Sequence, residues 1–302
     1  MNGRVALITG AGRGIGAAVA RRLASAGAAV VVNDYGVTLE GDPDGEQPAA
    51  TLVQEITQAG GSAVADGGDV SDFEAAEAMV RLAVERFGRL DIVINVAGIL
   101  RDRMLWNMTA DEWDAVIRVH LRGTFNTSRH AAALWRGLGD HDGGRRIINF
   151  SSTGGLFGAV GQPNYAAAKM GIVGLTYSSA NALARFGTTC NVIAPAAATR
   201  MTATPQDAAA ERRRSPENVA TVVQWLAGPR AAWCTGQVIS ARGFDVSLYA
   251  LPRPVARVRS DGPWDLDDLA DRLDAEFGPL VDRESSWPPV ERLPGERAEA
   301  AG

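Results

Sequence analysis

The chain has 302 residues, of which 46% are hydrophobic and 22% charged, and its formal net charge is −5. This composition is typical of a soluble protein with one large α/β domain or two small ones. No run of 18 apolar residues occurs, and only residues 5–8 separate Arg4 from a glycine run, so we expect neither a membrane span nor a secretion signal. The acidic balance argues against a nucleic-acid partner.

Cysteine, histidine and lysine are scarce. Cys190, Cys234 and three scattered histidines lack metal-ligand spacing, so we expect no metal, no disulfide framework and a cytoplasmic location. Of the 30 basic residues, Lys169 is the single lysine and the other 29 are arginines. A compact ammonium and a planar guanidinium are not interchangeable. Lys169 is therefore either a chance survivor or a residue whose chemistry arginine cannot supply.

Short apolar runs alternate with helical periodicity over the first 250 residues, which is the pattern of βαβ units. A first strand at 5–9 precedes a helical stripe through Ile15, Val19 and Leu23. Further strands are expected at 29–33, 63–65, 90–95, 146–150, 189–194 and 237–241, and further helices at 52–59, 71–87, 109–134, 165–186 and 217–226. We predict an α/β fold with a doubly wound, seven-stranded parallel sheet of the Rossmann type, in one domain spanning residues 1–250.

Residues 251–302 form a C-terminal extension with a different composition, rich in Pro, Arg and Asp. A stripe of Leu266, Leu269, Leu273 and Phe277 predicts one amphipathic helix over 265–277. The alternative is a disordered extension, because so polar a segment can bury little apolar surface.

The segment from Thr9 to Gly16 reads TGAGRGIG and lies between the first predicted strand and the first predicted helix. Such a position suits a phosphate loop: glycines permit the turn and a close backbone approach, and the helix N-terminus supplies N–H donors. The alternative is a turn with a purely structural role. We predict that a dinucleotide pyrophosphate binds at Gly10, Gly12, Arg13, Gly14, Ile15 and Gly16.

Asp34 lies 18 residues beyond Gly16, at the end of the second predicted strand. A carboxylate there can accept hydrogen bonds from the adenosine ribose and repels a 2′-phosphate, which favours NAD over NADP. Arg13 argues the other way, because a cation near the ribose could meet that phosphate; alternatively, Asp34 only begins a loop. Asp69 and Val70 follow the third strand and are expected beside the adenine, unless Asp69 is a solvated turn residue.

Tyr165 and Lys169 lie four residues apart on one face of a predicted helix, and Ser152 ends the preceding strand. Hydride transfer from an alcohol needs a base for the hydroxyl proton, and a phenol with a pKa near 10 is a poor base at neutral pH. A lysine ammonium about 5 Å away would favour the phenolate by about 3 kcal/mol. The spacing therefore predicts a dehydrogenase whose base is Tyr165; the alternative is a surface tyrosine beside an unrelated lysine.

These residues, with the run NVAG at 95–98, resemble the short-chain dehydrogenase/reductase family, in order and over about 240 residues. The resemblance implies that Tyr165 is the general acid/base, that Lys169 lowers its pKa and holds the nicotinamide ribose, and that Ser152 steadies the substrate oxygen. It implies a homodimer or homotetramer. It also implies cofactor contacts for Asn95, Ala97, Gly98, Pro195 and Thr199.

Departures from the family pattern point to a subfamily. Val96 replaces a second Asn, Ala196 replaces a Gly, and His120 stands where a fourth catalytic residue is commonly Asn. The runs VVND at 31–34, GILRDR at 98–103 and VHLRG at 119–123 are similar to the (R)-3-hydroxyacyl-CoA dehydrogenase unit of peroxisomal multifunctional enzyme type 2 and its stand-alone bacterial relatives. Histidine is the expected residue in that group, so His120 is included in the catalytic set.

The subfamily resemblance implies NAD-dependent oxidation of a 3-hydroxyacyl-CoA thioester. Arg101, Arg103 and Arg200 are expected at the cleft mouth, where they could bind a CoA phosphate, although arginine is common throughout the chain. The C-terminal sequence EAAG is no peroxisomal signal, which favours a free-standing cytoplasmic enzyme. Two alternatives stay open: a dehydrogenase of a free steroid, terpene or secondary-metabolite alcohol, and an NAD-sensing binding module that has no turnover.

Overall fold

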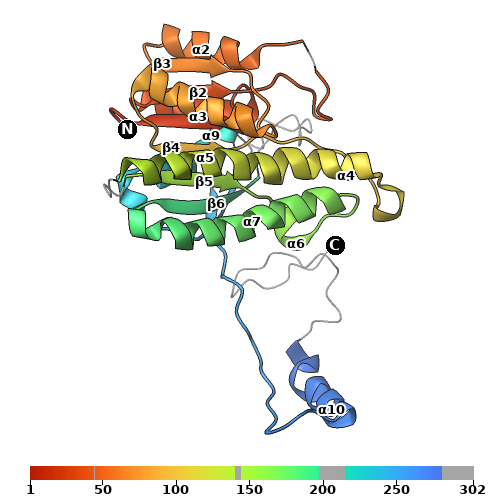
Figure 1. Ribbon diagram of the computed structural model, residues 1–302. Helices are drawn as coiled ribbons and strands as arrows, with labels where there is room; N and C mark the ends of the chain where they lie inside the picture. Colours follow the sequence, from red (N-terminus) through yellow and green to blue (C-terminus); the bar gives the residue numbers. More distant parts are fainter. Residues whose placement is uncertain (44, 140–143, 197–211, 213–214, 281–302) are drawn as a thin grey trace. The chain divides into compact units, whose positions relative to one another are not determined.

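The computed structural model describes residues 1–43, 45–139, 144–196, 212 and 215–280. Contacts divide the chain into two units, Met1–Tyr249 and Ala250–Gly302. The first unit holds an eight-stranded sheet of order β3-β2-β1-β4-β5-β6-β7-β8 (Figure 1). Its strands are β1 (Val5–Thr9), β2 (Ala29–Asn33), β3 (Ser62–Asp66), β4 (Ile92–Asn95), β5 (Arg146–Phe150), β6 (Thr189–Ala196), β7 (Val238–Arg242) and β8 (Asp245–Leu248).

The doubly wound parallel sheet is confirmed for its first seven strands, but the strand count is eight rather than seven. Strand β8 returns antiparallel to β7 through a tight turn, in which Gly243 has a φ of +59° that favours glycine. The strand has only four residues, and Val246 and Leu248 are exposed. No buried apolar face therefore marks β8 in the sequence.

Helices cover both faces of the sheet because alternate residues of each strand point to opposite sides. Ala6 and Ile8 of β1 belong to a core with α1 (Gly14–Ser25), α2 (Pro48–Gln58) and α9 (Pro216–Ala227). Val5 and Leu7 belong to a second core on the other face, where α5 and α7 cross in front of the sheet in Figure 1. The helices of this second face are α3 (Phe73–Phe87), α5 (Gly123–Leu138) and α7 (Pro163–Leu183).

The long helix expected at 109–134 is interrupted in its middle. Thr109 caps α4 (Ala110–Ile117) in a capping box with Glu112, and a π-helical turn at Arg118–Arg122 then leads into α5. Such turns re-aim side chains and are frequent at functional sites. Sequence analysis also missed two short helices, η1 (Leu105–Asn107) and α6 (Thr153–Phe157); η3 (Ala184–Phe186) and η4 (Pro229–Ala231) are further one-turn segments.

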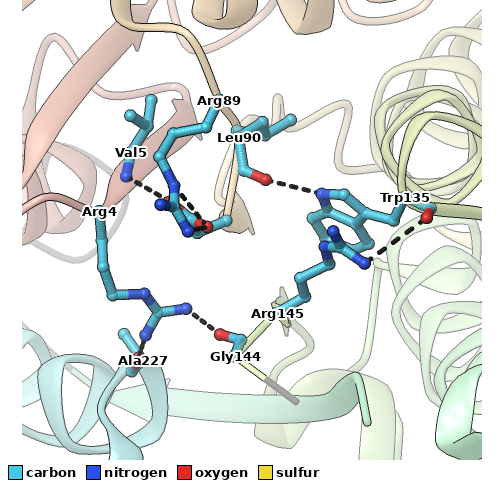
Figure 2. Close-up of polar contacts among 9 residues, drawn as sticks. Arg4, Val5, Arg89, Leu90, Trp135, Gly144, Arg145 and Ala227 are labelled. Carbon is cyan, nitrogen blue, oxygen red and sulfur yellow. Dashed lines mark hydrogen bonds and ion pairs between the residues drawn. The ribbon is translucent and has the colours of Figure 1, made fainter. Parts of the chain in front are cut away.

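The amino edge of the sheet is held by charged side chains that contact the protein itself (Figure 2). Arg4 donates to two backbone carbonyls that lie far away in the sequence. The Asp91 carboxylate accepts from the backbone N–H of Val5 at 2.8 Å and from the Arg89 guanidinium at 2.7 Å. The Trp135 indole donates to a backbone carbonyl 2.7 Å away. These contacts tie the starts of β1 and β4 to their neighbours.

In the second unit the predicted amphipathic helix is present as α10 (Leu266–Glu276), followed by η5 (Gly278–Leu280). The Asp265 carboxylate caps α10 by accepting from two backbone N–H groups. Within the described ranges, no helix is long and apolar enough to cross a bilayer. Nor do those residues include a group of three or more His, Cys, Asp or Glu side chains that could hold a metal ion.

Candidate active site

A cavity of about 290 Å³ opens at the carboxyl ends of the parallel strands. The sheet order places β1 beside β4, so successive connections diverge between these strands, which is where ligands bind in open α/β sheets. The cavity lining comprises the glycine loop, residues 33–35 and 37–41, residues 68–70, residues 96–99, Arg101, Ala115, residues 118–120, Phe150, Ser151, Tyr165, Lys169 and Pro195.

The glycine loop leaves no room for a side chain at Gly10, Gly12 or Gly16. A Cβ atom on Gly10 would lie 2.7 Å from the Cα atom of Ala97, and one on Gly16 would lie 2.2 Å from the carbonyl oxygen of Gly10. Helix α1 begins at Gly14, so its first N–H groups face the cavity that Gly14 lines. The loop therefore fits a pyrophosphate group in the manner expected.

The Asp34 carboxylate holds the glycine loop. One oxygen accepts from the backbone N–H of Gly12 at 2.9 Å, and the other accepts from that of Gly36 at 3.0 Å. Asp34 also lines the cavity, so it combines a turn role with a position suited to a ribose. The Arg13 guanidinium donates to the carbonyl of Val37 at 3.2 Å and pairs with Glu46.

Residues after β3 and β4 differ in how they relate to the cavity. Asp69 lines it, and its carboxylate accepts from the backbone N–H of Ser71 at 2.8 Å. Val70, Ala97 and Gly98 also line the cavity. Asn95 does not: its buried amide donates to Asn149 at 2.8 Å and accepts from the Thr127 hydroxyl at 2.6 Å. Asn95 thus links β4 to β5 and α5 inside the core.

Lys169 and Tyr165 project from the first turns of α7 into the cavity. The buried Lys169 ammonium donates to the carbonyl of Phe150 at 2.8 Å and lies 5.5 Å from the centre of the Tyr165 ring. Burial lowers the pKa of Lys169 to about 7. Burial also raises the pKa of Tyr165, a rise that the Ser152 hydroxyl opposes through a hydrogen bond. Desolvation thus opposes the charged form of both groups.

His120 enters the cavity from the π-helical turn. Its ring meets the Tyr165 ring edge-on at 5.2 Å between centroids, and its Nε2 atom lies 2.8 Å from the carbonyl oxygen of Ile99. The Nδ1 atom is buried without a hydrogen-bond partner in the described chain. Burial, with the Lys169 charge, lowers the pKa of His120 to about 3, so the imidazole is neutral at pH 7.

Asn164 is a site residue that sequence analysis missed. Its fully buried amide donates to the carbonyls of Arg101 and Glu112, both at 3.0 Å, and its oxygen accepts from the backbone N–H of Tyr165 at 2.7 Å. Asn164 thereby fixes the start of α7 against the loop at Arg101 and against helix α4. Only its place immediately before Tyr165 could have drawn attention to it.

The predicted arginines are not equivalent. Arg101 lines the cavity, and its guanidinium lies 3.4 Å from the Asp42 carboxylate. Arg103 is outside the cavity lining and pairs with Glu112 at 3.0 Å, a contact that helps to lower the pKa of Glu112 after the larger effect of the Thr109 backbone N–H. Pro195 lines the cavity, Ser152 lies beside Tyr165 and caps α6, and Thr199 and Arg200 lie outside the described residues.

Known proteins share this sequence and architecture. The chain is 46% identical over 288 residues to the hydroxyacyl-CoA dehydrogenase ChsB1 of Mycobacterium tuberculosis, covering 90% of this chain and 88% of that protein. It is 44% identical over 227 residues to the mouse peroxisomal multifunctional enzyme type 2. The matched region covers 74% of this chain but only 30% of that longer enzyme.

Solved structures agree. A short chain dehydrogenase from Mycobacterium avium superposes with a TM-score of 0.82 at 46% identity, covering 92% of this chain and 95% of that one. A short chain dehydrogenase from Burkholderia cenocepacia in complex with NADP gives 0.69 at 32% identity, covering 80% of this chain and 97% of that one. The family model described as short chain dehydrogenase matches residues 4–211. The chain therefore belongs to the short-chain dehydrogenase/reductase family and is an oxidoreductase.

Proposed function

We propose that this oxidoreductase is NAD-dependent and oxidises the 3-hydroxyl group of an (R)-3-hydroxyacyl-CoA thioester to a ketone. The observation that carries the chemistry is the placement of Tyr165 and Lys169 side by side in a cavity at the glycine loop. The substrate class is supported by the relatives named as hydroxyacyl-CoA dehydrogenase and multifunctional enzyme type 2. NAD is favoured over NADP by Asp34, whose carboxylate lines the cavity.

The proposed reaction separates the proton from the hydride. A bound nicotinamide ring supplies the hydride acceptor for the hydrogen on C3. The phenol oxygen of Tyr165, as phenolate, takes the hydroxyl proton, and the Ser152 hydroxyl orients the substrate oxygen. The charged Lys169 ammonium favours the phenolate, and its hydrogen bond to the Phe150 carbonyl keeps it beside the ring. The substrate C–H and O–H bonds break, and the carbonyl forms.

We propose that His120 helps to transfer the same hydroxyl proton. Its neutral ring has a hydrogen-bonded Nε2 atom, which leaves the buried Nδ1 atom as the one without a partner among the described residues. This atom accepts or donates according to the tautomer, because Nε2 contacts both the N–H and the carbonyl of Ile99, and in either case it can bind a water or a ribose hydroxyl near Tyr165. We place the whole site within residues 1–250 and propose the homodimer or homotetramer that the family resemblance implies.

The decisive experiment measures NAD reduction with both enantiomers of 3-hydroxyacyl-CoA of several chain lengths and with free steroid and terpene alcohols. Binding energy from the nucleotide part of CoA can hold C3 in place, so removing CoA should lower kcat/KM by several orders of magnitude. Equal turnover of a free alcohol would reject the thioester while keeping the oxidoreductase. Tyr165→Phe is the matched control, because turnover that survives loss of the phenol oxygen belongs to another protein or another mechanism.

A further inference from the structure

The Arg13 guanidinium, at the adenosine end of the cavity, is engaged by a neighbouring loop. Arg13 follows Gly12, whose N–H is bound by Asp34, and its side chain lines the cavity. An arginine there is the natural partner of a 2′-phosphate, because its planar fork binds phosphate oxygens in pairs. Instead, one terminal nitrogen donates to the carbonyl of Val37 and the other pairs with the Glu46 carboxylate.

Glu46 is placed by a folded loop, which we call the ribose loop and which comprises the described residues 35–43 and 45–47. The ribose loop closes on itself through an antiparallel bridge between Val37 and Pro43 and a hydrogen bond of 2.8 Å from Thr38 to Asp42. Gly36 has a φ of +73°, and a Cβ atom there would lie 2.6 Å from the carbonyl oxygen of Glu46. Backbone geometry at Gly36 therefore sets where Glu46 lies.

The ribose loop is also anchored to the segment after β4, whose residues 96–99 line the cavity. The backbone N–H of Leu100 donates to the carbonyl of Leu39 at 2.8 Å, and a Cβ atom on Gly41 would lie 3.1 Å from the Ile99 side chain. The ribose loop that carries Glu46 is thus fixed against the segment after β4, which helps to line the cavity. The Arg13 side chain is only 20% exposed, although Glu46 itself is 68% exposed.

We infer that Glu46 is a specificity-determining residue that sets the preference for NAD over NADP together with Asp34, by holding the Arg13 guanidinium away from a 2′-phosphate. The inference rests on the proposed function, in which this cavity binds a nicotinamide dinucleotide. With Glu46 in place, Arg13, Asp34 and Glu46 carry a net charge of −1, which opposes a dianionic phosphate. Without the Glu46 charge the three sum to zero, and the guanidinium loses a carboxylate that competes with the phosphate for it.

The test compares the dissociation constants of NAD and NADP for the full-length chain by calorimetric titration. Glu46→Gln should raise the affinity for NADP about tenfold and change that for NAD less than about twofold. Glu46→Asp keeps the charge and should retain most of the wild-type preference. Glu55→Gln breaks an exposed pair with Arg21 outside the cavity lining, so this matched loss of one carboxylate should leave both affinities unchanged.

A double variant separates the Arg13 contact from a general loss of negative charge. In an Arg13→Gln background, Glu46→Gln should no longer raise the affinity for NADP appreciably. An unchanged NADP-to-NAD ratio in Glu46→Gln, or an equal gain with and without Arg13, would overturn the inference while leaving an NAD-binding enzyme in place. If the wild-type chain binds neither dinucleotide, the proposed function fails as well, and the two failures are thereby told apart.

Discussion

At the amino edge of the sheet, the described contacts of Arg4, Arg89 and Asp91 are all made with other groups of the protein. At the carboxyl edge, Lys169 and Asp34 also contact the protein, but both line a cavity, and beside them His120 has a buried Nδ1 atom without a partner among the described residues. One sheet thus carries two polar edges with different properties, the first closed and the second open to a ligand.

The direction of the strands explains the difference. In a parallel sheet with crossover helices, the N-termini of the helices follow the carboxyl ends of the strands, so N–H donors gather at that edge. Polar groups at the other edge must find partners inside the protein, because a buried group without a hydrogen bond costs about 1–3 kcal/mol. Variants at the carboxyl edge should therefore change activity, and variants at the amino edge should change stability.

The largest expected effect is on turnover in Lys169→Arg. Arginine spreads its charge over a plane and needs more space, whereas the Lys169 site is buried and a Cβ atom on Gly155 would already lie 2.5 Å from that of Lys169. We expect kcat to fall by about a hundredfold or more, the range of general acid–base catalysis, while circular dichroism shows the native fold. A folded variant with wild-type kcat would remove Lys169 from the mechanism.

His120 makes the free energy of unfolding depend on pH. Its folded-state pKa of about 3 lies below the unfolded value of 6.5, so the unfolded chain binds more protons between these values and stability falls as the pH is lowered through that window. At pH 4.5 the loss from His120 should be about 3 kcal/mol relative to pH 7. Urea unfolding should show a smaller loss in His120→Gln, and equal losses in both proteins would contradict a buried neutral imidazole.

At the amino edge, Asp91→Asn should weaken the fold without touching the chemistry. The Asp91 side chain is 6% exposed and accepts from both Val5 and Arg89, so loss of its charge should cost about 2 kcal/mol of unfolding free energy. Glu85→Gln is the matched control, because its pair with Arg81 in α3 is exposed and should be worth less than about 0.5 kcal/mol. A change in KM or kcat of Asp91→Asn at a temperature where it is folded would break the division between the edges.

The smallest expected effect concerns Asp34. We expect wild-type protein to bind NAD at least about tenfold more tightly than NADP, or about 1.4 kcal/mol. Asp34→Ala should narrow this ratio, because it removes the ribose acceptor and the repulsion together. Both cofactors should also bind more weakly, since the carboxylate holds the glycine loop through Gly12. Titration of both cofactors decides it, and equal wild-type affinities would mean that Arg13 dominates.

Local sequence patterns were sufficient to predict many of the strands and several residues of the candidate site. Strands such as β1 can be predicted because both of their faces are buried and their residues are continuously apolar. The glycine loop can be predicted because its position between a strand and a helix is visible in the sequence. Tyr165 and Lys169 are neighbours because residues four apart share a helix face, whatever surrounds the helix. The missed strand β8 carries no such signal, since its apolar residues are exposed.

The surroundings of each side chain were decided by contacts between residues far apart in the chain. Asn95 turns into the core towards Asn149, and Asn164 bonds to a loop and to helix α4, which no periodicity connects to it. The pairing of Arg13 with Glu46 depends on how the ribose loop folds, and the raised pKa of Tyr165 depends on burial. A sequence pattern predicts which side chains share one face of a helix or strand. The burial of a side chain and its hydrogen-bond or ion-pair partners are fixed only when distant segments pack together.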